Sequence, residues 1–192
     1  MTLAPWRPAV AHALHRNRSL VYSRYVQLAT VDEYGRPANR TVVFRGFRAN
    51  TNQLLFVTDR RSQKAHQAVI QPWAEICWYF PKTREQFRLL GQIRLIAVDT
   101  PDPADHQLRQ QLWQQLSDPA RLQFTWPQPG AAAAGREAFT GDPPPNDEPV
   151  APFCVLLLEP ERVDHLELRG EPQNRWLYER RGDTWGSQQI NP

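Results

Sequence analysis

A cluster of side chains able to bind an anion occupies residues 60–67, which read RRSQKAHQ. It follows an apolar run, LLFVT, and precedes a segment of strong helix formers. A strand that runs into a helix N-terminus brings unpaired N–H groups and the positive end of the helix dipole to one place. Ser62 adds a hydroxyl, Gln63 an amide and Lys64 an ammonium, so a phosphate there would receive several charge-assisted hydrogen bonds. The residues alone leave a second interpretation open, in which Ser62 only caps the helix and the cations are solvated.

Lysine is rare in this chain, and this draws attention to Lys64. Lys64 and Lys82 are the only lysines, and all other basic side chains apart from histidine are arginine. Two of those arginines, Arg40 and Arg45, flank TVVF and are five residues apart. In a regular strand they would point to opposite faces, so a bulge at Gly46 or an edge must re-aim one of them before both can reach one ligand.

The elements that must position these residues read as an antiparallel meander. Strands are expected at 25–32, 39–47, 54–59, 74–80, 85–98, 152–168 and 174–185. Helices are expected within the first twenty residues, at 62–71 with Ser62 as N-cap and apolar positions Ala65, Ala68 and Val69, at 102–117, and briefly after 118. Segment 127–150 is rich in Pro and Gly and predicts a surface loop. Short strands in this order predict one domain over 1–192, a closed or nearly closed antiparallel barrel.

Composition excludes several classes of protein. A hydrophobic content of 41% excludes a mainly disordered chain. No apolar run reaches about 18 residues, so no membrane span is expected. The N-terminus lacks the apolar core of a signal peptide, and the two cysteines, Cys77 and Cys154, lie in runs that predict buried strands; both favour a cytoplasmic protein. The net charge of +3 is spread over arginines that alternate with acids, so nucleic-acid binding is not expected despite a pI near 9.1.

Three stretches taken together resemble one known family. They are LATVDEYGRPANRTVVFR (28–45), LLFVTDRRSQKAHQ (54–67) and FPKTREQFRLLG (80–91). In order and spacing they are similar to the motifs A-T-V-D-x-x-G-x-P, R-x-V-L-x-K, F-x-T-x-x-x-S-x-K-A and R-Q-V-x-x-x-G of the pyridoxamine 5′-phosphate oxidase family. The similarity covers about residues 25–98 and resumes in RWLYER near the C-terminus, so the chain resembles an FMN-binding split-barrel protein.

The resemblance implies a mainly β (α+β) fold, a six-stranded antiparallel split β-barrel with flanking helices, which dimerises with FMN at the dimer interface. By position, the strand along the flavin would be Arg40, Thr41, Val42, Val43 and Arg45. The ribityl phosphate would be held by Val57, Thr58, Ser62, Gln63 and Lys64. Gln86 would reach the isoalloxazine ring of the other subunit's flavin, and Gln128 and Arg175 would complete the site from the partner chain.

The chain also departs from the family pattern where the vitamin substrate binds. Arg45 replaces the lysine that ends R-x-V-L-x-K, and an arginine is a planar fork rather than a point donor. In the C-terminal signature W-x5-R-x-H-D-R only Arg175 is retained, since Gln173 stands at the histidine and Leu166 at the tryptophan. The flavin half of the site is therefore expected to be retained and the pyridoxal half to be lost.

Three interpretations of function remain open from these residues. The first is an FMN-dependent oxidoreductase acting on an unknown small molecule, with no catalytic acid or base assigned. The second is a true pyridoxamine or pyridoxine 5′-phosphate oxidase. The third is a non-catalytic flavin- or haem-binding split barrel. A haem protein needs an axial histidine, and His12 and His15, three apart on one helix, lack further ligands, so no metal site is predicted. His66, in the first turn of the helix that follows the phosphate motif, is expected to be structural.

Overall fold

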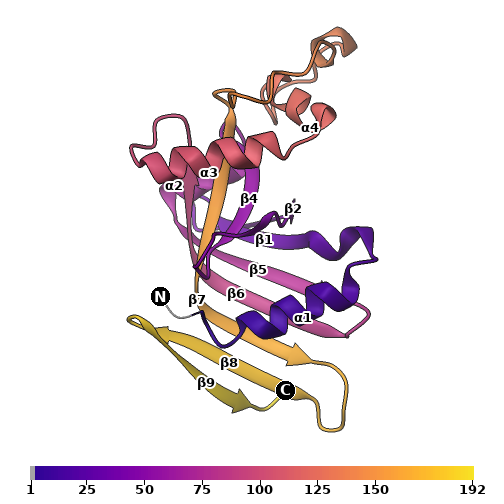
Figure 1. Cartoon of the computed structure of the whole chain (residues 1–192), viewed down its shortest axis with the longest axis vertical. Helices are drawn as coiled ribbons and strands as arrows, with labels where there is room; N and C mark the ends of the chain where they lie inside the picture. Colours follow the sequence, from indigo (N-terminus) through magenta and orange to yellow (C-terminus); the bar gives the residue numbers. More distant parts are fainter. Residues whose placement is uncertain (1–2) are drawn as a thin grey trace.

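The computed structural model describes residues 3–192, in which one antiparallel sheet carries helices at its ends and on one face (Figure 1). The strands are β1 (Tyr25–Val31), β2 (Pro37–Val43), β3 (Gly46–Phe47), β4 (Leu54–Asp59), β5 (Trp73–Phe80), β6 (Glu85–Ile96), β7 (Phe153–Glu167), β8 (Asn174–Arg181) and β9 (Thr184–Ile190). The α-helices are α1 (Arg7–Asn17), α2 (Gln63–Ile70), α3 (Pro103–Gln114) and α4 (Asp118–Leu122). Short 3₁₀ turns cover Val21–Arg24, Gln123–Thr125 and Arg136–Phe139.

The sheet is curled, with the order β2-β1-β5-β6-β7-β4-β3. The long strand β7 changes partner along its length, pairing with β4 through Phe153–Leu158 and with β8 through Arg162–Glu167. β6 pairs along both halves of β7, and the register shifts at Leu90/Gly91 opposite Pro160. A bulge at this point sharpens the twist and bends the strand, which lets one sheet wrap into a half-barrel while the β8–β9 hairpin leaves it as a ribbon.

Two hydrophobic clusters lie on opposite faces of this sheet. The larger one fills the inside of the curl, where Trp78, Phe80 and Phe87 are fully buried and Trp6 of the α1 end closes it. The smaller one lies under α3, where Leu112 and Trp113 pack on Phe153. Successive strand residues face opposite sides, so the apolar run FCVLLL of β7 contributes to both clusters, which explains why it is continuously buried.

The structure confirms the predicted fold class and most of the predicted elements. Strand 54–59 has the predicted limits, and the six strands of the predicted barrel correspond to β1, β2, β4, β5, β6 and β7. The strand predicted at 174–185 is β8 and the start of β9, which the chain separates by a turn at Gly182. The strand predicted at 39–47 was wrong in its continuity: it ends at Val43 and resumes as β3 at Gly46, whose φ of +139° suits glycine. Because α2 is short and packs through its alanines, Val69 is exposed rather than on the buried face.

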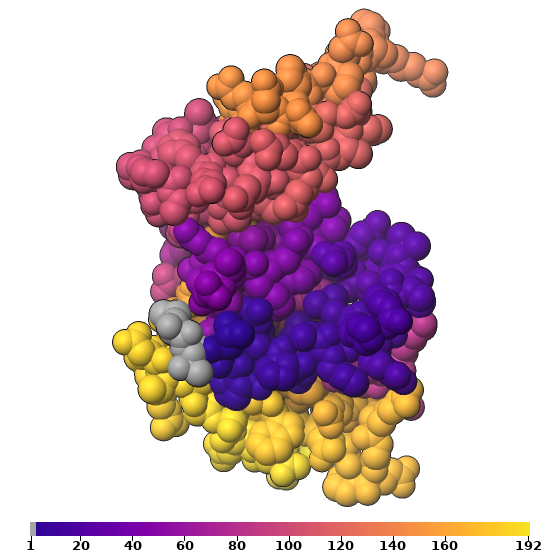
Figure 2. All heavy atoms as spheres, in the orientation of Figure 1, coloured from indigo at the N-terminus to yellow at the C-terminus, as the bar shows by residue number. Residues whose placement is uncertain are grey.

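Segment 127–150 is the exposed excursion that the sequence predicts, and it projects from the end of the molecule beyond α3 and α4 (Figure 2). Its return half is tied to the helices by buried arginines. Arg109 donates to the carbonyl oxygens of Phe153 and Val150, and Arg121 donates to that of Pro144. Within residues 3–192, no helix is long and apolar enough to cross a membrane.

Candidate functional site

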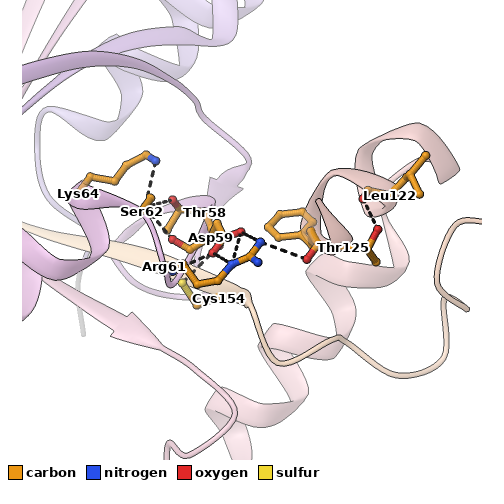
Figure 3. A network of polar contacts seen from close by, with 9 residues as sticks. Thr58, Asp59, Arg61, Ser62, Lys64, Leu122, Thr125 and Cys154 are labelled. Carbon is orange, nitrogen blue, oxygen red and sulfur yellow. Dashed lines mark hydrogen bonds and ion pairs between the residues drawn. The ribbon is translucent and has the colours of Figure 1, made fainter. Parts of the chain in front are cut away.

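The predicted phosphate cluster forms a compact polar group where β4 runs into α2 (Figure 3). The Lys64 ammonium donates to Ser62 Oγ at 3.3 Å, and Ser62 Oγ lies 3.3 Å from Thr58 Oγ1. Ser62 occupies the N-cap position, but its hydroxyl donates to the Asp59 carbonyl at 2.7 Å instead of accepting a bond from the helix. The prediction that Ser62 caps α2 through its side chain was therefore wrong, because the tight turn places that hydroxyl against the end of β4.

Arg40 brings a second cation to Lys64. Its guanidinium reaches from β2 under α2 and donates to Gln67 Oε1 at 2.9 Å. Burial and the neighbouring Arg40 charge lower the pKa of the Lys64 ammonium, and burial lowers the pKa of Arg40. Neither side chain forms an ion pair with a carboxylate in the part of the chain described, 3–192. Two adjacent, partly desolvated cations without a counter-ion are what a phosphate dianion would stabilise.

The other cations of the cluster are occupied elsewhere. The Arg61 guanidinium holds Asp59 in a two-pronged pair, with Nη2–Oδ2 at 2.6 Å, and this hydrogen bond raises the pKa of Arg61 (Figure 3). Arg60 pairs with the exposed Asp99 at 3.2 Å. The nearest carboxylate, Asp59, is thus already neutralised, and Lys64 and Arg40 remain the cations available to a ligand.

A cavity of about 640 Å³ opens beside this group. One wall is the face of α2 formed by Gln63, His66, Gln67 and Ile70, together with Arg60, Arg61 and Ser62 of the preceding turn. Neither Lys64 nor Arg40 lines this cavity. The opposite walls are the β1–β2 turn at residues 32–34 and the start of the exposed excursion at 128–131. Gln128 therefore lines the same cavity as Ser62 and Gln63 of its own chain, and its role in a partner's site stays a prediction. His66 is exposed in this wall rather than a structural residue.

A second group of predicted residues lies on the outer face of the sheet, away from the inner core. Thr41 and Val43 of β2, Gln86 of β6 and Arg175 of β8 all lie at least partly exposed on that face. Strand register places Gln86 opposite Leu166, which is opposite Arg175. The Arg175 guanidinium is paired with Asp164, at 3.0 and 2.7 Å, and this hydrogen bond lowers the pKa of Asp164.

Three predicted residues are not brought to either group by their side chains. Val42 is buried in the inner core, and Val57 packs against the cluster under α3, so only their backbone could meet a ligand. Arg45 lies beyond the end of β2 and lines a separate cleft against α3. Arg40 and Arg45 thus lie at different sites, as predicted from the opposite directions of two strand residues that are five apart.

Comparison with known families shows to which family the chain belongs. Residues 3–97 match the family described as pyridoxamine 5′-phosphate oxidase, FMN-binding domain. Pyridoxine/pyridoxamine 5′-phosphate oxidase 2 of Arabidopsis thaliana is 39% identical over 194 residues, which cover 99% of this chain and 98% of that protein. The chain belongs to this family. The predicted cofactor, FMN, is the one that the family's domain binds, and the cationic group at α2 fits its phosphate.

Other members of the family support the assignment. The pyridoxine/pyridoxamine 5′-phosphate oxidase of Anaeromyxobacter dehalogenans is 31% identical over 177 residues, 86% of this chain and 83% of that protein. The crystal structure of a pyridoxamine 5′-phosphate oxidase-related, FMN-binding protein from Nostoc punctiforme covers all of both chains with 62% identity and a TM-score of 0.97. PhzG from Burkholderia lata, at 21% identity and a TM-score of 0.77, shares the fold.

One cluster away from α2 has the composition of a metal site. Glu85, His165 and Glu167 place their ligand atoms within 4.8 Å of one another. His165 Nε2 lies 2.9 Å from Glu85 Oε2, closer than the about 3.3 Å that separates two ligands of a tetrahedral zinc ion. Burial alone would raise the pKa of Glu85, but hydrogen bonds from His165 and Thr83 lower it on balance. The cluster is thus a hydrogen-bonded pair with a third side chain nearby, and the absence of a metal site stays a prediction.

Sequence reasoning missed two side chains that support the cationic group, Thr30 and Gln67. Both are buried and polar, and both contact Arg40. The sequence could have indicated Gln67, because it lies one helical turn after Lys64 in KAHQ and so on the same side of the helix. Nothing in the local sequence relates either residue to Arg40.

Proposed function

We propose that this protein is an FMN-dependent oxidoreductase acting on a small molecule. The observation that carries the proposal is the pair of cations, Arg40 and Lys64, which lie without an ion-paired carboxylate around the N-terminal part of α2, where Lys64 contacts Ser62. When bound, FMN supplies hydride-transfer chemistry at its ring, and the chain supplies binding and orientation. Ser62, Gln63 and Lys64 would hold the phosphate, with Thr58 supporting the Ser62 hydroxyl.

We also propose that the working unit is a homodimer with FMN at its interface. The outer face of the sheet supports this, because it exposes Tyr25 and Tyr79, 46% and 49% accessible, beside the predicted flavin residues Thr41 and Gln86. Exposed large aromatic side chains on a sheet face are typical of a surface that a partner covers. The single-domain organisation and the cytoplasmic location remain predictions of the same kind.

Oxidation of pyridoxamine or pyridoxine 5′-phosphate is a second candidate. It is favoured by the near full-length relative of that name in Arabidopsis thaliana. The departures in the C-terminal signature weigh against it, because the resemblance assigns the arginine and histidine of that signature to the pyridoxal substrate, and Gln173 stands at the histidine. Peroxide release from the FMN-loaded protein with pyridoxamine 5′-phosphate measures this directly; background rates favour another substrate, and sustained turnover favours the oxidase.

A double variant tests the proposed cofactor site. In Ser62→Ala/Lys64→Ala, FMN affinity should fall by about 10-fold to 100-fold, since a hydrogen bond to a charged group contributes about 1.5–3 kcal/mol. Riboflavin, which lacks only the phosphate, should bind within about 3-fold of wild type, since a 3-fold change is about 0.65 kcal/mol. Lys82→Ala is the matched control, because Lys82 is the other lysine and contacts Ser19 on a different part of the surface.

Binding is followed by quenching of flavin fluorescence, and the wild-type protein should keep a two-banded flavin spectrum through gel filtration. Equal losses of FMN and riboflavin affinity would show that these side chains do not hold the phosphate. A wild-type protein that takes up no FMN on titration would refute the proposed function itself.

A further inference from the structure

Arg40 is held by neutral acceptors only. Its Nη2 donates to Gln67 Oε1 at 2.9 Å, and its Nη1 donates to Thr30 Oγ1 at 2.5 Å and to the Leu28 carbonyl at 3.3 Å. Thr30 in turn donates to Gln67 Oε1 at 2.6 Å. The three side chains come from β1, β2 and α2 and close a ring beneath the middle of the helix.

The orientation of the Gln67 amide follows from its partners. A guanidinium has N–H donors and no acceptor, so the atom facing Arg40 must be the amide oxygen. Gln67 is 9% exposed and Thr30 1% exposed, which makes both groups buried and their hydrogen bonds necessary. Gln67 also lines the cavity. Gln67 therefore contacts Arg40, which does not line the cavity, from the cavity side.

We infer that Gln67 is a positioning residue for the phosphate of the cofactor, one that orients Arg40 while leaving its charge uncompensated. The inference rests on the proposed FMN site. A carboxylate at this position would accept the same two hydrogen bonds but would also neutralise Arg40. Its negative charge would lie among the groups that receive the phosphate, where like charges repel. The amide provides the geometry without that cost.

The contrast between an amide and a carboxylate separates this role from a structural one. If Gln67 only stabilised the fold, Gln67→Glu would serve as well, because a carboxylate accepts hydrogen bonds from arginine more strongly than an amide does. If Gln67 preserves the charge of Arg40 for the ligand, the same variant must lose phosphate recognition while the apoprotein stays folded. The two roles therefore predict opposite results for one isosteric change.

The experiment measures FMN and riboflavin dissociation constants and the melting temperature for wild type, Gln67→Glu, Gln67→Ala and Gln71→Glu. Gln71, at the C-cap of the same helix, is the control for adding one negative charge to α2. We expect Gln67→Glu to bind FMN at least 30-fold more weakly with riboflavin affinity within 3-fold and an undiminished melting temperature. Gln67→Ala should lose about 3-fold to 10-fold in FMN affinity, and Gln71→Glu less than 3-fold.

Inorganic phosphate provides a second readout that does not involve the flavin ring. It should compete with FMN on the wild-type protein and fail to compete on Gln67→Glu. Wild-type FMN affinity in Gln67→Glu, or an equal loss in Gln71→Glu, would overturn the inference while leaving the proposed function intact. Failure of the wild-type protein to bind FMN would overturn both the inference and the proposed function. This outcome is distinguishable because it is seen in the wild-type titration, before any variant is measured.

Discussion

The glycine of the FRLLG motif should be required by a close approach of two strands. Gly91 lies in β6 at the register shift, opposite Pro160 of β7. Proline has no N–H to give to the sheet, so a proline in an inner strand belongs at such an irregularity. A Cβ built on Gly91 would lie 2.0 Å from the Glu159 carbonyl oxygen and 2.8 Å from Pro160 Cα, both backbone atoms.

The size of the effect of Gly91→Ala follows from this overlap. Carbon and carbonyl oxygen atoms make contact at about 3.3 Å, so β6 and β7 would have to separate by about 1.3 Å at the bulge. Overpacking a rigid interior costs about 1–3 kcal/mol, and here the obstacle is backbone that also carries the sheet's hydrogen bonds. We expect a loss of about 3 kcal/mol, which for a chain of this length lowers the melting temperature by about 6–12 °C.

Urea and thermal unfolding of Gly91→Ala, followed by circular dichroism, measure this loss. Gly186→Ala is the matched control, because Gly186 is also a strand glycine but its Cβ would meet no atom closer than 3.9 Å. That variant should stay within about 1 kcal/mol of wild type. If Gly91→Ala were as stable as Gly186→Ala, the claim that this glycine exists for the close approach of β7 would be refuted.

Two further predictions concern a buried ion pair and the cysteines. Burial alone would raise the pKa of Asp105, but its bonds to Arg94 and Arg48 hold that pKa below its ordinary value. The ionised Asp105 therefore stabilises the fold above about pH 4, and this stabilisation is lost as the pH falls through the lowered pKa. Asp105→Asn should therefore lower the free energy of unfolding by about 2 kcal/mol at pH 7. The variant and the wild type should differ less in this free energy at acid pH, and a difference that does not change with pH would contradict this prediction. Burial raises the pKa of Cys154 to about 12, so iodoacetamide at pH 8 should leave Cys154 unmodified in the native protein. The half-buried Cys77 should react slowly, and mass spectrometry measures both rates. Equal reaction rates of the two cysteines in the native protein would contradict the assigned burial.

Where sequence reasoning and structure differ, the difference lies in which strands and helices meet. The sequence placed both cysteines in buried strands, but Cys77 faces the outer side of the sheet and is only half-buried. Gln128 is predicted to complete a partner's site, and only the fold shows that it also lines the cavity beside Ser62 of its own chain. Alternation along a strand predicts that its residues face two sides, but the curl of the whole sheet decides which side is enclosed.

The sequence by itself determined the cluster to which the phosphate is predicted to bind. Thr58, Ser62 and Lys64 are at most six residues apart, and the turn from a strand into a helix fixes their contacts whatever the rest of the chain does. Only the tertiary structure decided what accompanies them. Gln67 meets Arg40 across 27 residues, and Arg175 meets Asp164 across a strand pair, because the docking of α2 and the register of the sheet bring them together. Local sequence thus specified the proposed anchor of the cofactor, and long-range packing specified which side chains accompany it.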